Sequence, residues 1–140
     1  MKTYAGDLFI ELPGSWDDDS MHVYRQEASD MEVRVERYPV EPSATPEALL
    51  EPMTERLALV GPLEGLQRGE ADVGGFRAAT LSVSCQREGD AAATLLEVAV
   101  FKPKETEAIT LTALAPAKER ARLAALRDAL LTRSRIVEVR

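Results

Sequence analysis

The clearest pattern in the chain is an alternation of apolar and charged residues between positions 31 and 36. In an extended segment Met31, Val33 and Val35 would point to one side, and the charged side chains between them would point to the other. A period of two residues is typical of a strand with one buried face. We therefore predict a strand over residues 31–36 that contributes its apolar side to a core.

Six further short apolar segments end at turn residues, among them Pro13-Gly14 and Gly74-Gly75. Such dipeptides separate strands. Segments 8–12 and 21–25 are expected to form a β-meander with strand 31–36. Segment 94–102 is apolar on both sides, so it is expected to lie inside the sheet. The predicted strands comprise residues 8–12, 21–25, 66–73, 76–86, 94–102 and 107–115, with residues 136–139 as an edge strand or a tail.

A helical period replaces the alternation after position 45. Thr45, Pro46 and Glu47 supply an N-cap, a proline at the first helical position and an acid in the first turn, so we predict a helix from Pro46 to about Leu59. Pro52 lacks a backbone donor and is expected to kink or break this helix. The apolar stripe of the helix comprises Leu49, Leu50, Met53, Leu57 and Val60.

A second helix is predicted from Pro116 to about Leu131, where Leu123, Leu126 and Leu130 recur at helical spacing. The order of elements is three strands, a helix, four strands and a helix, without a βαβ rhythm. This order predicts an α+β fold in which an antiparallel sheet of six or seven strands packs with two main helices. The length of 140 residues favours a single domain over residues 1–140.

Composition narrows the classes of protein to which the chain can belong. Apolar residues make up 45% and charged residues 29%, which is typical of a globular chain. No apolar run approaches the roughly 18 residues of a membrane span, and the N-terminal segment lacks a secretory apolar region. Cys85 is the single cysteine and cannot form an internal disulfide. We therefore expect a cytoplasmic protein with no direct membrane insertion.

The charge balance argues against nucleic acid as a partner. The chain has 24 acidic and 17 basic residues, a net charge of -7, and the acidic excess lies in the first half. Binding to phosphate backbones requires clustered lysine and arginine. The glycines do not follow a phosphate-binding motif either, so no cofactor is expected.

Few residues could support catalysis or metal binding. His22 is the only histidine, and Cys85 lies on an apolar strand face, where a free cysteine usually acts as a small core residue. Asp17, Asp18 and Asp19 lack the glycine and distal glutamate of an EF-hand loop, which favours a solvated turn over a weak cation site. Glu97 interrupts an apolar strand and is expected to be ion-paired or at an edge. We expect no enzyme, no catalytic residue and no metal site.

The opening segment carries a resemblance to a known family. Tyr4, Leu12-Pro13, Trp16 and the turn from Asp17 to Ser20 resemble the start of the DcrB-like family, which shares the PsbP-like α/β sandwich fold. Cytoplasmic members of that family look like the Eag chaperones of type VI secretion, which hold the transmembrane segments of effectors and act as dimers. The resemblance implies a non-catalytic chaperone or adaptor, a homodimer, whose partner is the hydrophobic helical segment of a secreted effector protein.

A surface for such a segment can be suggested from the strand pattern. A sheet face that accepts an apolar helix would be lined by Met21, Val23, Met31, Val33 and Val35. The same side chains could instead form the core under one of the protein's own helices, because a half-buried strand has the same pattern in both cases.

A second class of function stays open at this point. The chain could be a solitary interaction domain, such as an immunity or accessory protein, that recognises a folded partner through its acidic half.

Overall fold

The computed structural model describes residues 2–5, 8–11, 17–18, 23–87 and 89–136, which form two antiparallel sheets, two α-helices and two short 3-10 helices. The main sheet has seven strands in the order β3-β4-β5-β9-β8-β7-β6. The antiparallel α+β fold expected from the sequence is therefore confirmed. The strands of this sheet are β3 (Asp17–Asp18), β4 (Val23–Gln26), β5 (Met31–Pro39), β6 (Leu63–Val73), β7 (Phe76–Cys85), β8 (Thr94–Lys104) and β9 (Glu107–Pro116).

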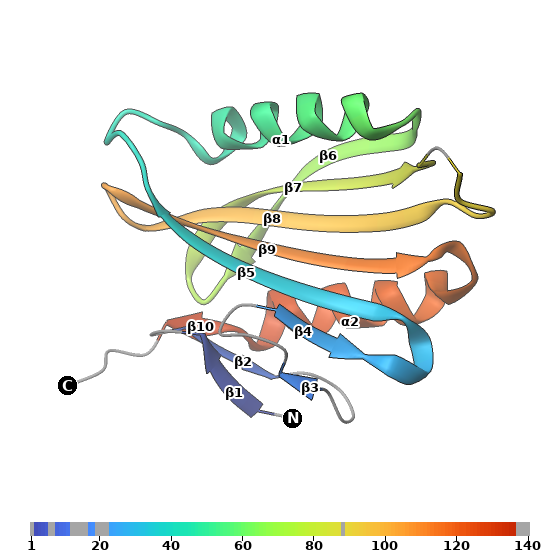
Figure 1. The fold of residues 1–140 in the computed structure, drawn as a ribbon. Coiled ribbons are helices and arrows are strands. Elements are labelled where there is room, and N and C mark those ends of the chain that lie inside the picture. Colours follow the sequence, from blue (N-terminus) through green and yellow to red (C-terminus); the bar gives the residue numbers. More distant parts are fainter. Residues whose placement is uncertain (1, 6–7, 12–16, 19–22, 88, 137–140) are drawn as a thin grey trace.

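The other elements lie on the two faces of this sheet (Figure 1). One face carries α1, and the opposite face carries α2 together with a small three-stranded sheet in the order β1-β2-β10. Two 3-10 helices, η1 and η2, lie between β4 and β5 and directly before α2. The bounds are β1 (Lys2–Ala5), β2 (Leu8–Glu11), β10 (Arg135–Ile136), α1 (Pro46–Val60), α2 (Arg120–Arg133), η1 (Glu27–Ser29) and η2 (Ala117–Glu119).

Two apolar clusters hold these layers together, one on each face of the main sheet. The cluster under α2 joins the helix to β5, β8 and β9, and it includes Ile10 from the small sheet. The cluster under α1 joins Leu50 to apolar side chains of β7 and β8. β8 is apolar on both sides and lies between β7 and β9, as its pattern predicted. Cys85 is buried in the cluster under α1, which confirms its expected place in the core.

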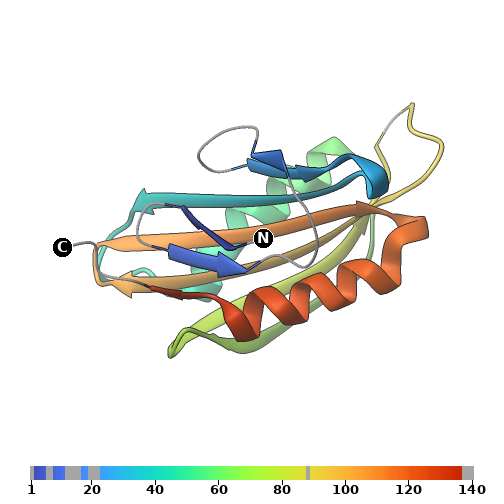
Figure 2. The same ribbon diagram turned by 90° about the horizontal axis from the view of Figure 1, so that it is seen from below.

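The first predicted strand lies elsewhere than expected. β2 does not join β4 and β5 in a meander but pairs with β1 on one side and β10 on the other, as Figure 2 shows from below. Alternation predicts a strand without specifying its partner, and β1 is the nearest segment able to pair. Ile10 of β2 is fully buried against the α2 side of the core, so the small sheet covers a part of that face.

The first helix differs from the prediction in two respects. α1 continues past Pro52 without a break, because Leu49 and Leu50 before the proline and Met53 after it pack on the same sheet face. Val60 was expected in the apolar stripe but is 46% exposed, since the helix ends there and the chain turns into β6.

The start of α1 is fixed to the sheet by polar contacts. The Thr45 side chain accepts a hydrogen bond from the backbone nitrogen of Ala48 and caps the helix. The ammonium group of Lys102 on β8 donates to the carbonyl oxygens of Pro42 at 2.9 Å and Ala44 at 2.8 Å, and lies 3.4 Å from that of Glu41. One lysine therefore holds the loop that positions the helix.

We predict that Lys102→Met weakens the fold by about 1–3 kcal/mol, because three carbonyl groups lose a charged donor. Lys104→Met is the control, since Lys104 is exposed two residues further along the same strand. Denaturant unfolding measures both variants, and equal stability of the two would contradict the anchoring role of Lys102.

Candidate functional site

A groove runs between α2 and strands β6, β7 and β8. It consists of two adjoining hollows of about 260 and 480 Å³, which share Ser82, Glu97 and Arg127 in their walls. Leu111, Leu130 and Leu131 line the first hollow, and Leu95, Leu123 and Ala124 line the second. Volumes of this size are at the lower end of the range for ligand sites in proteins.

The groove exists because the strands facing α2 carry small side chains there. Gly69 and Ala71 of β6 stand opposite Thr80 and Ala78 of β7, and Ser82 follows on the same face. These residues are too short to reach the helix. The β6–β7 turn, in contrast, closes onto the chain after α2, where a side chain at Gly74 would come within 3.0 Å of the Cα atom of Arg135. The middle of the hairpin is therefore left open while its tip is packed.

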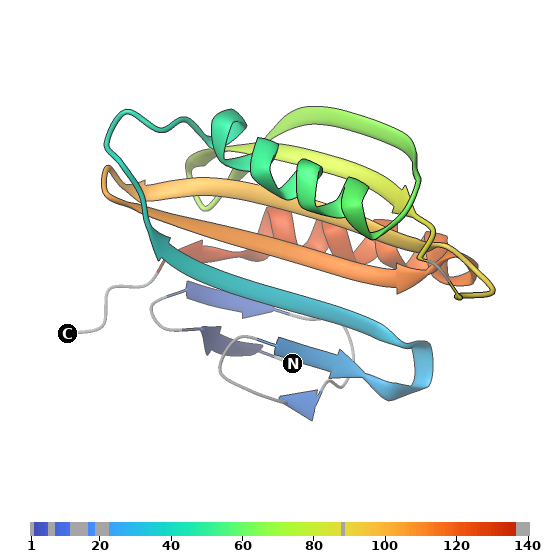
Figure 3. The same cartoon turned by 45° about the horizontal axis from the view of Figure 1, so that its top comes forward.

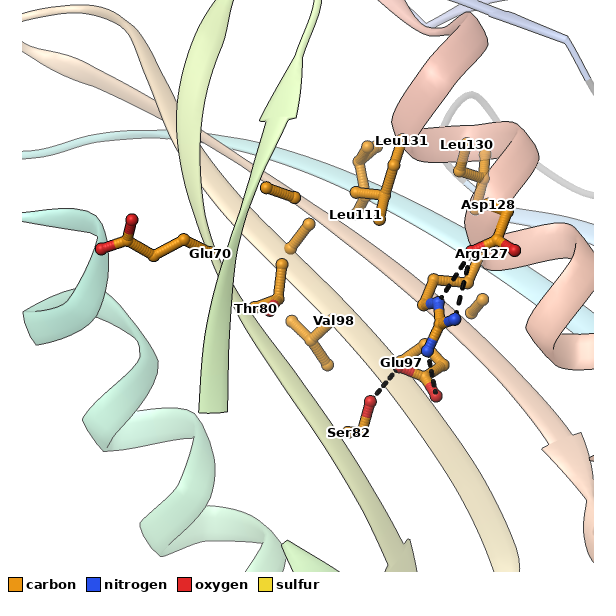
Figure 4. A pocket seen from close by; sticks show the side chains of 13 residues that line it. Glu70, Thr80, Ser82, Glu97, Val98, Leu111, Arg127, Asp128, Leu130 and Leu131 are labelled. Atoms are coloured by element: carbon orange, nitrogen blue, oxygen red, sulfur yellow. Dashed lines mark hydrogen bonds and ion pairs between the residues drawn. The ribbon is translucent and has the colours of Figure 1, made fainter. Parts of the chain in front are cut away.

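A polar bridge lies in the wall that the two hollows share, and Figure 4 shows it from the side of the first hollow. The Ser82 hydroxyl donates a hydrogen bond to the Glu97 carboxylate, and Arg127 Nη1 lies 3.7 Å from Glu97 Oε1. Arg127 also pairs with Asp128 at 3.1 Å. Glu97 is 17% exposed and has partners on both β7 and α2. The expectation that Glu97 is ion-paired is confirmed.

The chemistry of the groove suits a ligand with apolar and polar parts. The half-buried Leu131 and Ala124 of the helix offer apolar surface, while Ser82, Glu97 and Arg127 offer donors and acceptors near the middle. This combination is typical of sites that bury a few side chains and orient them with a few polar contacts.

The apolar residues of strand 31–36 lie outside this groove. Met31, Val33 and Val35 are 4%, 0% and 2% exposed and belong to the cluster under α2. In this structure they therefore form part of the core under one of the protein's own helices, the second possibility that the sequence left open. On their side of β5 they pack in one cluster with the leucines of α2 and with Ile10 of the small sheet.

Val23 does not share a face with those three residues. The β4–β5 register pairs Val23 with Arg34 and Tyr24 with Val33, so it is Tyr24 that points into the same core as Val33. Val23 is half-buried on the opposite side. Met21, the remaining residue of the expected surface, lies outside the described residues, as does His22.

The opposite side of β4 and β5 carries a compact charge cluster. α1 contacts β7 and β8 and leaves this part of the face uncovered (Figure 3). Arg25 Nε donates to Glu32 Oε1 at 2.8 Å, and Arg34 donates to the other carboxylate oxygen. Burial acts to raise the pKa of Glu32, but the hydrogen bond from Arg25 and the charge of Arg34 outweigh it, so the pKa is lowered.

The other candidate residues form no recognisable metal site. Asp17 and Asp18 form β3 and pair with β4, and Asp19 lies outside the described residues. Among the residues that the structure describes, there is no group of three or more histidine, cysteine or acidic residues that could hold a metal ion. No helix in the described part of the chain is long and apolar enough to cross a membrane.

The sequence analysis missed the groove, although a signal for it is present. Thr80, Ser82 and Ser84 alternate with apolar residues along β7, a pattern that suggests a strand with one face in solvent. In the structure α2 lies over that face. Small polar residues opposite a helix would be the feature to search for.

Comparison with known proteins gives a family and a fold. The sequence profile of the DcrB family matches residues 8–131. No curated protein matches the chain.

Three solved structures cover nearly the whole chain. LpqN of Mycobacterium tuberculosis, a protein involved in cell envelope biogenesis, has a TM-score of 0.67 at 16% identity, over 99% of this chain and 90% of its own. PA94 of Pseudomonas aeruginosa, a protein of unknown function described as a candidate regulator, has a TM-score of 0.59 at 18% identity, over 100% of this chain and 97% of its own. The cyanobacterial PsbP of Synechocystis sp. PCC 6803 has a TM-score of 0.62 at 13% identity, over 93% of this chain and 86% of its own. The PsbP-like fold is therefore confirmed.

We predict that Val33→Asp removes most of the stability of the protein, by roughly 3–5 kcal/mol, because it buries an unpaired charge in the cluster under α2. Leu59→Asp is the matched control. Leu59 is 88% exposed, so the same charge there should cost less than about 1 kcal/mol. A folded Val33→Asp protein with wild-type unfolding would show that Val33 is accessible after all.

We predict that Glu32 makes the stability depend on pH. Its lowered pKa means that the stabilisation is present above the pKa of the unfolded state and is lost as the pH falls through the folded-state pKa. The difference in unfolding free energy between wild type and Glu32→Gln should therefore be largest at neutral pH and shrink below about pH 4. A difference independent of pH would contradict this, and Glu36→Gln, an exposed position on the same strand, controls for the loss of one charge.

Proposed function

The chain belongs to the DcrB family, and from this membership and the groove beside α2 we propose that the protein is a non-catalytic protein that binds a segment of another protein. The single observation that carries the proposal is the groove itself: two adjoining hollows with apolar and polar side chains in their walls, which share the Ser82, Glu97 and Arg127 bridge. It gives the protein a place for side chains of a partner.

The finer proposal concerns the partner. We propose a cytoplasmic chaperone or adaptor, acting as a homodimer, that holds an apolar helical segment of a type VI secretion effector before export. The resemblance of the opening segment to the Eag branch supports this partner class. Because Met31, Val33 and Val35 are buried, the groove beside α2 replaces the apolar face of β5 as the binding surface in this proposal.

The dimensions of the groove decide how a helix would bind. An α-helix with its side chains is about 10–12 Å wide, so it does not fit into hollows of 260 and 480 Å³. It can lie along the groove and insert side chains from one face, at helical spacing. Side chains from successive turns would then lie on either side of the bridge between Glu97 and Arg127. A polar residue of the segment could pair with that bridge.

A second candidate function is supported by a different surface. The cluster of Arg25, Glu32 and Arg34 lies on the part of the sheet that α1 leaves uncovered, and both arginines are exposed. A charged face of this kind suits a folded partner better than an apolar helix. The alternative of an interaction domain, such as an immunity or accessory protein, rests on this observation.

We predict that Ala124→Trp weakens binding of an apolar helix at least about tenfold, a loss of ~1.4 kcal/mol, because the indole would fill the larger hollow. The probe is a labelled leucine-alanine helix of about 20 residues with lysines at both ends, the length of a membrane span. Fluorescence anisotropy gives the dissociation constant.

Ala125→Trp is the matched control, since Ala125 is the next residue of α2 and is exposed. It should bind the peptide as the wild type does. Equal binding by both variants would remove the groove as the site. Failure of the wild type to bind the peptide would contradict the chaperone proposal and favour the interaction domain.

A further inference from the structure

The two edges of the main sheet differ in length and in cover. One edge is β3, a strand of two residues. The other is β6, which has 11 residues, contains no proline and, among the strands that the structure describes, pairs with β7 alone. Most of its residues are exposed, Gly69 included, so its outer edge is open to solvent. A long open edge is a template for pairing with another strand.

The turn after β6 decides which of its residues face this open edge. Gly74 and Gly75 have φ values of 59° and 89° and form a two-residue turn, so Val73 and Phe76 are the pair that exchanges backbone hydrogen bonds. Such pairs alternate along an antiparallel ladder. Counting back along β6 from Val73 in steps of two, Gly69 directs its backbone N–H and C=O groups to β7. Arg68 and Glu70 direct theirs outward.

From this alternation and the charges of the strand, we propose that β6 pairs with β6 of a second copy of the chain, antiparallel and centred on Gly69. In this register Arg68 of each copy stands opposite Glu70 of the other, and the two residues exchange backbone hydrogen bonds. The pairing joins two sheets into one of fourteen strands across a two-fold axis. The inference rests on the homodimer of the proposed function, and not on what the groove binds.

Charge complementarity selects this register among the three centred on Arg68, Gly69 or Glu70. Centring the pair on Arg68 would place two arginines opposite each other, and centring it on Glu70 would place two glutamates there; like charges directly opposite are unfavourable. Of these three centres, only Gly69 makes two Arg–Glu pairs. The ion pairs that Arg68 and Glu70 make within one chain do not prevent pairing with the second copy. Arg68 lies 3.3 Å from Glu51 and Glu70 lies 2.6 Å from Arg77, in pairs that are about half exposed.

The test is a charge swap, read out as the mass in solution of the purified chain without any partner. The wild type should sediment with twice the 15.3 kDa of one chain. Arg68→Glu places a carboxylate opposite Glu70 of the second copy, and Glu70→Arg places two guanidinium groups opposite each other. Each single variant should raise the dissociation constant of the dimer about tenfold or more. The double variant restores opposite charges in every pair and should restore the dimer.

Arg56→Glu is the control for the change in net charge, since Arg56 is exposed on α1. It should leave the dimer intact. A monomeric wild type would overturn the inference, and so would a dimer that survives both single variants. A double variant as monomeric as the single ones would overturn the proposed register. Peptide binding by a monomeric variant would show that the groove works without the β6 pairing, so the two proposals can fail separately.

Discussion

Strands β8 and β9 lie inside the main sheet with apolar side chains on both faces, and both faces must therefore be covered. The remaining elements provide this cover. α1 covers β7 and β8 on one side, and α2 with the small sheet covers β5, β8 and β9 on the other. The N-terminal strands are recruited to the α2 side because one helix is too narrow for that face. The three-layer arrangement follows from this requirement.

The same requirement explains the groove. α2 approaches both β9 and β6, and the residues of β6 and β7 that face it, among them Gly69, Ala71 and Ala78, are small and leave space beneath the helix. The hairpin tip closes the far end through the close approach of Gly74 to the backbone after the helix. The described residues leave the space between α2 and the middle of the hairpin unfilled. The Glu97–Arg127 bridge crosses this space, because a partly buried carboxylate on β8 is stabilised by a cation and α2 supplies one.

The sequence analysis succeeded where one residue pattern has one structural meaning. Alternation in residues 31–36 and the capped start at Thr45 predicted β5 and α1, and Glu97 was placed correctly as a paired residue. It failed where the outcome depends on which elements meet. Alternation did not reveal that β2 pairs with β1 and β10, nor that Val23 lies out of phase with Val33, since both depend on pairing and register.

The groove was hidden for the same reason. The alternating serines of β7 suggest solvent until α2 is known to lie across them. At Pro52 the local pattern was clear but the prediction from it was wrong. A proline inside a helix removes a backbone hydrogen bond, yet α1 continues because both of its halves pack on one face of the sheet. Tertiary contacts thus determined the elements whose local patterns were ambiguous.

The two sides of β5 indicate where a partner can and cannot bind. Its apolar side is sealed by α2 and β2, so access there would require opening the core that holds the layers together. Its polar side is open but carries Glu32 between two arginines, a cluster whose charges already satisfy one another. An apolar segment gains nothing on either side without a large cost in desolvation or unfolding. The groove beside α2 differs from both, because Leu131 and Ala124 in its walls are only half-buried and the Glu97–Arg127 pair is partly exposed. This makes it the surface at which binding disturbs the fold least.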